Sequence, residues 1–310
     1  MNVYIPIASS LLSSILLISI QKYFFKKQLY DPILKRSSHK TKATRSGGIA
    51  IFLSSLIISI YFYLNQIEIF DYSLLIPLSI LLIVGLYDDI YDVDFKLKFL
   101  FQIITAKILI DYGLIIDNFH GILGVFELNR IFAQVFTIFI IVAIINAINF
   151  IDGIDTLACL IISIFIFSFE FFSNGQSRFF YFSIIILSSI IPLIYFNLRK
   201  KNKIFLGDSG SLFLGGLVAI YVLEILSPNY IIKPQYDLNK IIFVISVLIY
   251  PIIDIVRVFF LRILNRRSPF IADRNHIHHI ILLKMNSHIK TSLIISLISL
   301  LFLLLTHLIF

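Results

Sequence analysis

The chain has 310 residues, of which 59% are hydrophobic and only 14% are charged. Soluble globular domains are about half apolar and a quarter charged, so this composition excludes a soluble domain, a secreted disulfide scaffold and a disordered chain. The net charge of +8 and the single cysteine, Cys159, indicate basic loops at a membrane surface; they do not indicate a nucleic-acid-binding domain or a cysteine metal site.

Apolar segments long enough to cross a bilayer recur along the whole chain. The candidates cover residues 3–23, 47–64, 72–86, 97–116, 131–148, 156–172, 179–196, 211–226, 241–264 and 292–310. The sequence therefore predicts an all-α fold, a polytopic integral-membrane helical bundle with about ten transmembrane helices and a single domain over residues 1–310. No cleavable signal peptide is expected, because basic residues follow the first segment and none precedes it.

The basic residues are distributed unevenly between the two sides of the predicted membrane. Of the 26 Lys and Arg residues, 20 fall in the loops that follow the odd-numbered segments and 4 fall in the other loops. Because cytoplasmic loops are rich in Lys and Arg, this asymmetry predicts that both termini lie outside and that the basic loops are cytoplasmic. We expect a multi-pass protein of the inner (plasma) membrane.

The polar motifs lie on this same basic side, one in each odd-numbered loop. They read SSHKTKATRSGG from Ser37, GLYDDIYDVD from Gly85, NAINFIDGID from Asn146, IFLGDSGS from Ile204 and RSPFIADRNHIHH from Arg267. A transporter more often carries its ionisable groups near the middle of the bilayer. Motifs gathered at one interface favour an enzyme with one substrate in the cytosol and another in the membrane, and a transporter is the alternative from a different class.

Carboxylates dominate the second and third motifs. Asp88 and Asp89 lie at the end of an apolar segment, and Asn149, Asp152 and Asp155 recur at a spacing of three. Carboxylates packed this closely repel one another unless a cation compensates, and Mg²⁺ prefers such oxygen ligands together with substrate phosphate. The alternatives are a solvated acidic turn for the first pair and helix capping for the second group.

The last two motifs suggest anion binding. Gly207 to Ser211 lead into an apolar segment, where free backbone N–H groups at a helix start can face a phosphate, although many Gly-Asp turns have no such role. His276, His278 and His279 follow Arg266, Arg267 and Arg274. A zinc site is one interpretation, but the absence of cysteine ligands and the basic neighbours favour a diphosphate-binding patch.

Other polar residues have simpler explanations. Asp254 and Arg257 stand three apart within one apolar segment, where they can form an ion pair. The isolated His120, His288 and His307 are expected at the membrane interface or in solvent.

Taken together and in this order, the five motifs resemble those of the polyprenyl-phosphate N-acetylhexosamine-1-phosphate transferases. That family includes the enzymes that initiate O-antigen, enterobacterial common antigen and teichoic acid synthesis, and the phospho-MurNAc-pentapeptide translocase. The resemblance extends from about Ser37 to His279. It implies a Mg²⁺-dependent reaction, with Mn²⁺ as the alternative ion, in which undecaprenyl phosphate attacks a UDP-N-acetylhexosamine and UMP is released.

The resemblance also implies roles for individual residues. Asp208 matches the Mg²⁺-binding aspartate, and Asp88 and Asp89 match an acidic pair that deprotonates or positions the lipid phosphate. Asn149, Asp152 and Asp155 match the motif on the nucleotide and metal side, so Asp152 is the second expected metal ligand. Phe205 matches an aromatic residue that stacks on uracil. Diphosphate binding is expected of the basic cluster formed by Arg267, His276, His278 and His279.

The final motif, ADRNHIHH, looks like that of the branch that uses a simple UDP-N-acetylhexosamine. UDP-GlcNAc is the expected donor, and UDP-GalNAc, UDP-QuiNAc and UDP-FucNAc stay open. Thr156 stands where the family usually has glycine. The expected partners are the two substrates and membrane lipids, without nucleic acid, and a homodimer stays open. A CDP-alcohol phosphotransferase is disfavoured, because Asp152-Gly153 is not followed by its motif, and an inactive homologue is the remaining alternative.

Overall fold

The computed structural model describes residues 4–31, 42–236, 238–266 and 275–309. Helices account for nearly all of its regular structure, and every predicted apolar segment contains one. The α-helices are α1 Tyr4–Lys26, α2 Gly47–Leu64, α3 Leu75–Tyr91, α4 Phe95–Asp111, α5 Arg130–Ile151, α6 Leu157–Phe172, α7 Phe180–Asn197, α8 Gly207–Leu226, α9 Lys240–Val247, α10 Ile249–Leu264, α11 Ile277–Met285 and α12 His288–Ile309. The short elements are η1 Tyr72–Leu74, η2 Ile122–Gly124, η3 Pro234–Tyr236, β1 Ala43–Thr44 and β2 Lys203–Ile204.

Among the described residues, 7 helices are long and apolar enough to cross a membrane, or 8 if α9 and α10 form one bent span. The spans include α1, α2, η1 with α3, α5, α7, α8 and α12. α4 and α6, with 17 and 16 residues, are shorter. The all-α, polytopic membrane fold is confirmed, whereas the number of ten spans and the orientation of the termini remain predictions.

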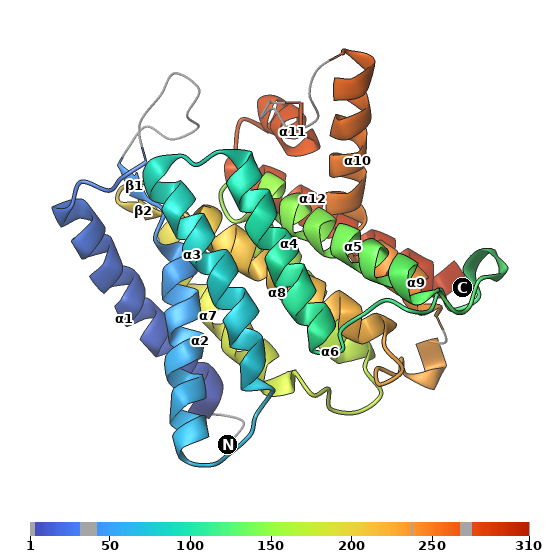
Figure 1. Ribbon diagram of the computed structural model, residues 1–310. Coiled ribbons are helices and arrows are strands. Elements are labelled where there is room, and N and C mark those ends of the chain that lie inside the picture. Colours follow the sequence, from blue (N-terminus) through green and yellow to red (C-terminus); the bar gives the residue numbers. More distant parts are fainter. Residues whose placement is uncertain (1–3, 32–41, 237, 267–274, 310) are drawn as a thin grey trace.

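The segment predicted as one uninterrupted span over residues 241–264 is instead broken. α9 and α10 meet at Leu248, where the path of the helices bends by 75°. Pro251 accounts for the break, because it has no N–H to donate to the carbonyl of Val247 and its ring would collide with that carbonyl. α10 consequently projects away from the bundle, at the upper right of Figure 1.

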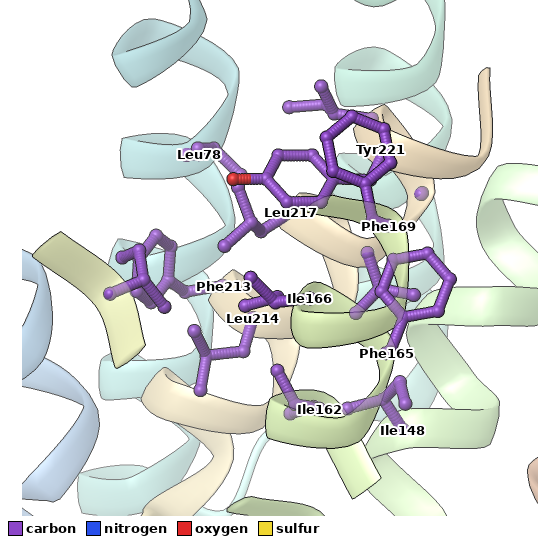
Figure 2. Close-up of a cluster of buried hydrophobic side chains, with 14 of the residues drawn as sticks. Leu78, Ile148, Ile162, Phe165, Ile166, Phe169, Phe213, Leu214, Leu217 and Tyr221 are labelled. Atoms are coloured by element: carbon purple, nitrogen blue, oxygen red, sulfur yellow. The ribbon is translucent and has the colours of Figure 1, made fainter. Parts of the chain in front are cut away.

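α8 is the central helix of the bundle, packed against α2, α3, α5 and α6. All of its residues except Asp208 are buried. Figure 2 shows its apolar side chains meeting those of α6, with Tyr221 beside Phe169. These two rings stack with centroids 4.6 Å apart, and the Tyr221 hydroxyl hydrogen-bonds to Ser183 Oγ at 2.9 Å. The phenol can therefore be buried without an unsatisfied polar group.

Glycines let the neighbouring helices approach α8 closely near its N-terminus. A Cβ on Gly48 of α2 would lie 2.1 Å from Gly210 Cα, and one on Gly85 of α3 would lie 2.3 Å from the Asp208 carbonyl oxygen. No side chain fits at such distances, so glycine sets the spacing of α2 and α3 from the start of α8.

The polar motifs meet at one end of the bundle, where α1, α3 and α5 end and α2, α8 and α12 begin (Figure 1). We call this the polar end. There β1 and β2 pair in parallel, with Ala43 opposite Lys203 and Thr44 opposite Ile204. The pairing continues as Gly47 N–H donates to the Phe205 carbonyl at 2.9 Å, which joins the first motif to the fourth.

Candidate active site

Asp89 joins α3 to the start of α8. Its carboxylate accepts hydrogen bonds from the backbone N–H groups of Asp208 and Ser209, both at 2.9 Å, and its side chain is 1% exposed. The first N–H groups of a helix have no partner within the helix, so Asp89 satisfies two of them and interacts favourably with the helix dipole. The fourth motif is held against the second by this contact.

Asp208 lies at the centre of a cluster of charged and polar side chains. Its carboxylate accepts from Asn149 Nδ2 at 3.2 Å and from Lys98 Nζ at 3.3 Å. Lys98 also donates to Asp88 at 2.8 Å, so one ammonium group bridges two aspartates. Asn149 Nδ2 is shared with Ser211 Oγ at 2.8 Å. Three motifs far apart in the sequence therefore meet at Asp208.

The Asp152 carboxyl group lies close to other carboxylates of the site. Burial, together with the carboxylates of Asp208 and Asp89, raises the pKa of Asp152 well above its usual range. Carboxylates that raise one another's pKa in this way are relieved by a bound cation. The donors are carboxylate oxygens, which Mg²⁺ prefers, so the residues present fit that ion.

Asp155 is fixed by partners from two other elements. Its carboxylate pairs with Lys203 of β2 and lies 3.7 Å from His288 Nδ1, and its carbonyl accepts from Ser292 Oγ at 2.7 Å. His288 was expected at the membrane interface or in solvent. It lies at the start of α12 with its side chain 21% exposed, and its contact with Asp155 was not foreseen from the sequence. Sequence separation concealed the contact, since the two residues lie 133 positions apart.

The residue after Asp155 has an unusual backbone. Thr156 has φ of 66° at the N-cap of α6. This left-handed conformation disfavours a β-branched side chain and suits glycine, which is the residue usually found there in the transferases that the sequence resembles.

The three histidines of the last motif occupy different positions. His276 and His279 line the cavity of the site, whereas His278 is fully buried behind them, with Nδ1 2.9 Å from the Tyr250 hydroxyl. Burial, with His279 adding to it, lowers the pKa of His278 to about 3, so this ring is neutral at pH 7. His278 therefore supports the segment of residues 276–279, which we call the histidine segment, and adds no positive charge to the site.

The spacing of Asp254 and Arg257 suggested an ion pair between them, but the two side chains do not form one. Asp254 accepts instead from His276 Nδ1, at 2.6 Å, while Arg257 donates to the Asn275 carbonyl at 2.5 Å. The reason is that Asp254 belongs to the buried side of α10, together with Tyr250, Val258 and Arg262, and this side faces the histidine segment.

The cavity of the site has a volume of about 2190 Å³. At the polar end its wall contains Asp88, Asp89, Asn149, Asp152, Asp155, Phe205, Asp208, His276 and His279. From there the cavity continues along apolar side chains of α5, α9 and α10, among them Phe136, Phe139, Val244, Ile252 and Phe259. A charged compartment and an apolar one are therefore continuous.

The structure brings together every predicted site residue that it describes, apart from the recessed His278; Arg267 lies outside the described residues. Five further residues contact the site, although this was not predicted from the sequence: Arg45, Lys98, Lys203, His288 and Asp254. Arg45 pairs with Asp31 and lies 3.8 Å from Asp89. Its position inside the first motif was an available signal, whereas nothing local marked Lys98, which stands two positions from another lysine.

Comparison with known proteins gives a consistent result. The model of glycosyl transferase family 4 matches residues 69–226, which include Asp88, Asp89, Asn149, Asp152, Asp155 and Asp208.

Three relatives illustrate the similarity over most of the chain. A probable undecaprenyl-phosphate N-acetylglucosaminyl 1-phosphate transferase of Bacillus subtilis is 31% identical, over 91% of this chain and 78% of its own length. The undecaprenyl-phosphate alpha-N-acetylglucosaminyl 1-phosphate transferase of Haemophilus influenzae is 32% identical, over 81% and 71%. The decaprenyl-phosphate N-acetylglucosaminephosphotransferase of Mycobacterium leprae is 29% identical, over 84% and 72%.

Proposed function

Because this chain belongs to glycosyl transferase family 4, we propose that it transfers N-acetylglucosamine 1-phosphate from UDP-N-acetylglucosamine to undecaprenyl phosphate. An oxygen of the lipid phosphate attacks the β-phosphorus of the donor, and the bond from that phosphorus to the bridging oxygen breaks. UMP leaves with the bridging oxygen, and undecaprenyl-diphospho-N-acetylglucosamine remains in the membrane.

The observation that carries this proposal is the continuity of the cavity. One wall holds the carboxylates and histidines suited to a charged nucleotide sugar, and the other is an apolar surface on α5, α9 and α10 suited to a polyprenyl chain. The lipid phosphate and the donor diphosphate can meet only where these two surfaces join. A transporter is disfavoured, because the charged side chains that line the cavity in the described part of the chain gather at the polar end.

On the acceptor side, Asp88 and Lys98 are placed to act on the lipid phosphate. Lys98 already pairs with two carboxylates, and its ammonium can hold a phosphate oxygen beside them. Of the acidic pair, Asp88 is the better candidate to accept a proton or to orient the nucleophile: the Val93 N–H occupies its Oδ1, but its Oδ2 is held by the Lys98 side chain and not by the backbone. Both Asp89 oxygens are engaged by backbone N–H groups of α8.

On the donor side, Phe205 offers a ring for uracil, and Asn149 and Asp155 can position the nucleotide. His276 and His279 supply donors for the diphosphate, with Arg267 as a further cation from outside the described residues. Because both substrates are anions, alignment and charge neutralisation provide most of the rate acceleration.

Asp208 and Asp152 would hold the metal ion. Mg²⁺ bound there would neutralise charge on the transferred phosphoryl group, as divalent cations do in other phosphoryl transfers. Asn149 orients the Asp208 carboxylate, and Asp89 fixes the backbone that carries it. We further propose that the polar end faces the cytoplasm, where nucleotide sugars are found, in agreement with the distribution of basic loops.

The test is UMP release by the purified protein supplied with undecaprenyl phosphate, Mg²⁺ and one UDP-sugar at a time. We expect release only when both substrates are present, with UDP-GlcNAc preferred over UDP-GalNAc, UDP-QuiNAc and UDP-FucNAc. A folded protein that releases no UMP with any of these donors would contradict the proposal. Release without lipid phosphate would indicate hydrolysis in place of transfer.

A further inference from the structure

Asp254 lies outside the five motifs, yet it contacts a residue of the last one. It stands in the middle of α10, is 1% exposed, and is separated from His276 by 22 positions. Its Oδ2 lies 2.6 Å from His276 Nδ1, and its Oδ1 accepts from the Ile277 backbone N–H, also at 2.6 Å. Both carboxylate oxygens are therefore directed at the histidine segment.

This contact determines which ring nitrogen of His276 can reach a substrate. A carboxylate only accepts hydrogen bonds, so the Nδ1 that faces it carries a proton. The imidazole lines the cavity, which leaves Nε2 as its nitrogen for a ligand. The Phe150 ring, with its centroid 5.5 Å away, restricts rotation of the imidazole from the side.

The surroundings keep the histidine segment next to the nucleotide-side motif. One turn before Asp254, Tyr250 contacts His278 Nδ1, and the His276 and His278 rings lie nearly parallel with centroids 5.3 Å apart. A Cβ on Gly153 would lie only 3.1 Å from His278 Nε2. Asp152, an expected metal ligand, is therefore adjacent in sequence to a residue in contact with this segment.

We propose that Asp254 is a positioning residue: it holds His276 so that Nε2 donates a hydrogen bond to the diphosphate of the nucleotide sugar. The inference rests on the proposed function and adds to it a residue that touches no substrate. With a carboxylate at Nδ1 and a phosphate oxygen at Nε2, the ring donates on both sides and carries two protons. The resulting imidazolium neutralises part of the diphosphate charge.

A metal ion is the competing explanation for the same three residues. One ligand atom each from Asp254, His276 and His278 lie within 4.8 Å of one another, which is compatible with a metal site. Two features favour the positioning role: Asp254 bonds directly to Nδ1 of His276, and Tyr250 occupies Nδ1 of His278. Zinc analysis of the purified protein separates the two explanations.

The test compares Asp254→Asn, His276→Asn and the double variant in the full-length protein. The asparagine that replaces Asp254 keeps an oxygen for the Ile277 N–H, while its amide nitrogen cannot accept from Nδ1. We expect each single variant to raise KM for UDP-GlcNAc about tenfold or more, the range for losing a hydrogen bond to a charged group. KM for undecaprenyl phosphate should stay unchanged. The double variant should be no worse than His276→Asn, because Asp254 acts through His276.

Arg257→Gln is the matched control. It removes the hydrogen bond from Arg257 to the Asn275 carbonyl, and so loosens the same segment without touching Asp254 or His276. Its KM for UDP-GlcNAc should be that of the unaltered protein. An equal rise in KM in this control would mean that Asp254 acts only by anchoring the segment, and would overturn the proposal.

Two further outcomes also overturn it. Additive effects in the double variant would show that Asp254 acts independently of His276, and stoichiometric zinc in the purified protein would identify a metal site. Calorimetric binding of UDP alone separates this inference from the proposed function. If the unaltered protein binds UDP but releases no UMP, the proposed function fails, while weaker UDP binding by both single variants would still support the pairing.

Discussion

Asp208 is the residue on which the charge balance of the site depends. It lies among Asn149, Lys98 and Asp88, near the raised-pKa carboxyl of Asp152. We expect Asp208→Asn to lower the turnover number at least about a hundredfold, the usual effect of removing one group that stabilises a transition state. The melting temperature should be unchanged, because an asparagine oxygen still accepts from Asn149. UMP release across a Mg²⁺ titration, with thermal unfolding alongside, measures both quantities.

Asp94→Asn is the control for that substitution. Asp94 is an exposed aspartate near the site, and it caps α4 by accepting from the Lys96 N–H at 3.2 Å. Asparagine caps helices about as well, so this variant should retain full activity. Near-normal turnover of Asp208→Asn at every Mg²⁺ concentration would remove Asp208 from the metal site.

His278 gives the protein a defined response to acid. Burial lowers its pKa from 6.5 to about 3, so the unfolded chain binds the proton more tightly than the folded one. The stability contributed by the neutral ring is complete above pH 6.5 and is lost as the pH falls towards 3. We expect the melting temperature to fall between about pH 7 and pH 5, and to fall less in His278→Gln. Parallel declines in the two proteins would show that His278 is not responsible.

At the scale of elements, the contact between α3 and α8 sets the distance between Asp88 and Asp208. It depends on Gly85, where a Cβ would lie 2.3 Å from the Asp208 carbonyl oxygen. Gly85→Ala should force the two helices apart, with a loss of about 1–3 kcal/mol in the free energy of unfolding. The turnover number should also fall in the protein that still folds, since Lys98 could no longer bridge the carboxylates of Asp88 and Asp208.

The exposed side of the same helix provides a comparison. Ser79 lies towards that side and donates to the Ile76 carbonyl of its own helix, so Ser79→Ala should leave activity and melting temperature unchanged. Denaturation and UMP release of both variants measure the difference. A fully active Gly85→Ala protein would mean that the α3–α8 spacing is not critical.

Some elements were predictable and others were not, for physical reasons. Long apolar runs indicated a helix in each case. The core of a bilayer has no water to hydrogen-bond the backbone, and a helix satisfies its N–H and C=O groups internally. The break between α9 and α10 was missed, although Pro251 was visible as its signal. The pairing of β1 with β2 could not be foreseen, since these two-residue strands lie 160 positions apart in register.

At the scale of the molecule, the motifs indicated which residues gather but not how each is used. Apolar spans of similar length return the chain to the same end, so motifs in alternate loops had to meet. The role of each residue depends on tertiary contacts: Asp89 caps α8, Lys98 bridges Asp88 and Asp208, and His278 is buried behind the cavity. Neighbouring aspartates in one motif thus acquire different roles, which local sequence does not encode.

The proposed reaction also requires the polar end to face the cytoplasm, and labelling can test this. Cys159 is buried and is the single cysteine, so it can be replaced by serine to give a cysteine-free background. Cysteines at Lys201 and Asn275, both exposed at the polar end, should react with an impermeant maleimide only from the cytoplasm. A cysteine at Asn229, exposed beyond the far end of α8, should react only from outside.

This labelling pattern separates the orientation from the site itself. Labelling at the positions of Lys201 and Asn275 from opposite sides would contradict a site shared by these two segments, because they could not then line one cavity. Labelling of both from outside would preserve the cavity but reverse the chain, against the distribution of basic residues. The donor would then have to be extracellular, so only cytoplasmic labelling of both positions is compatible with a nucleotide-sugar substrate.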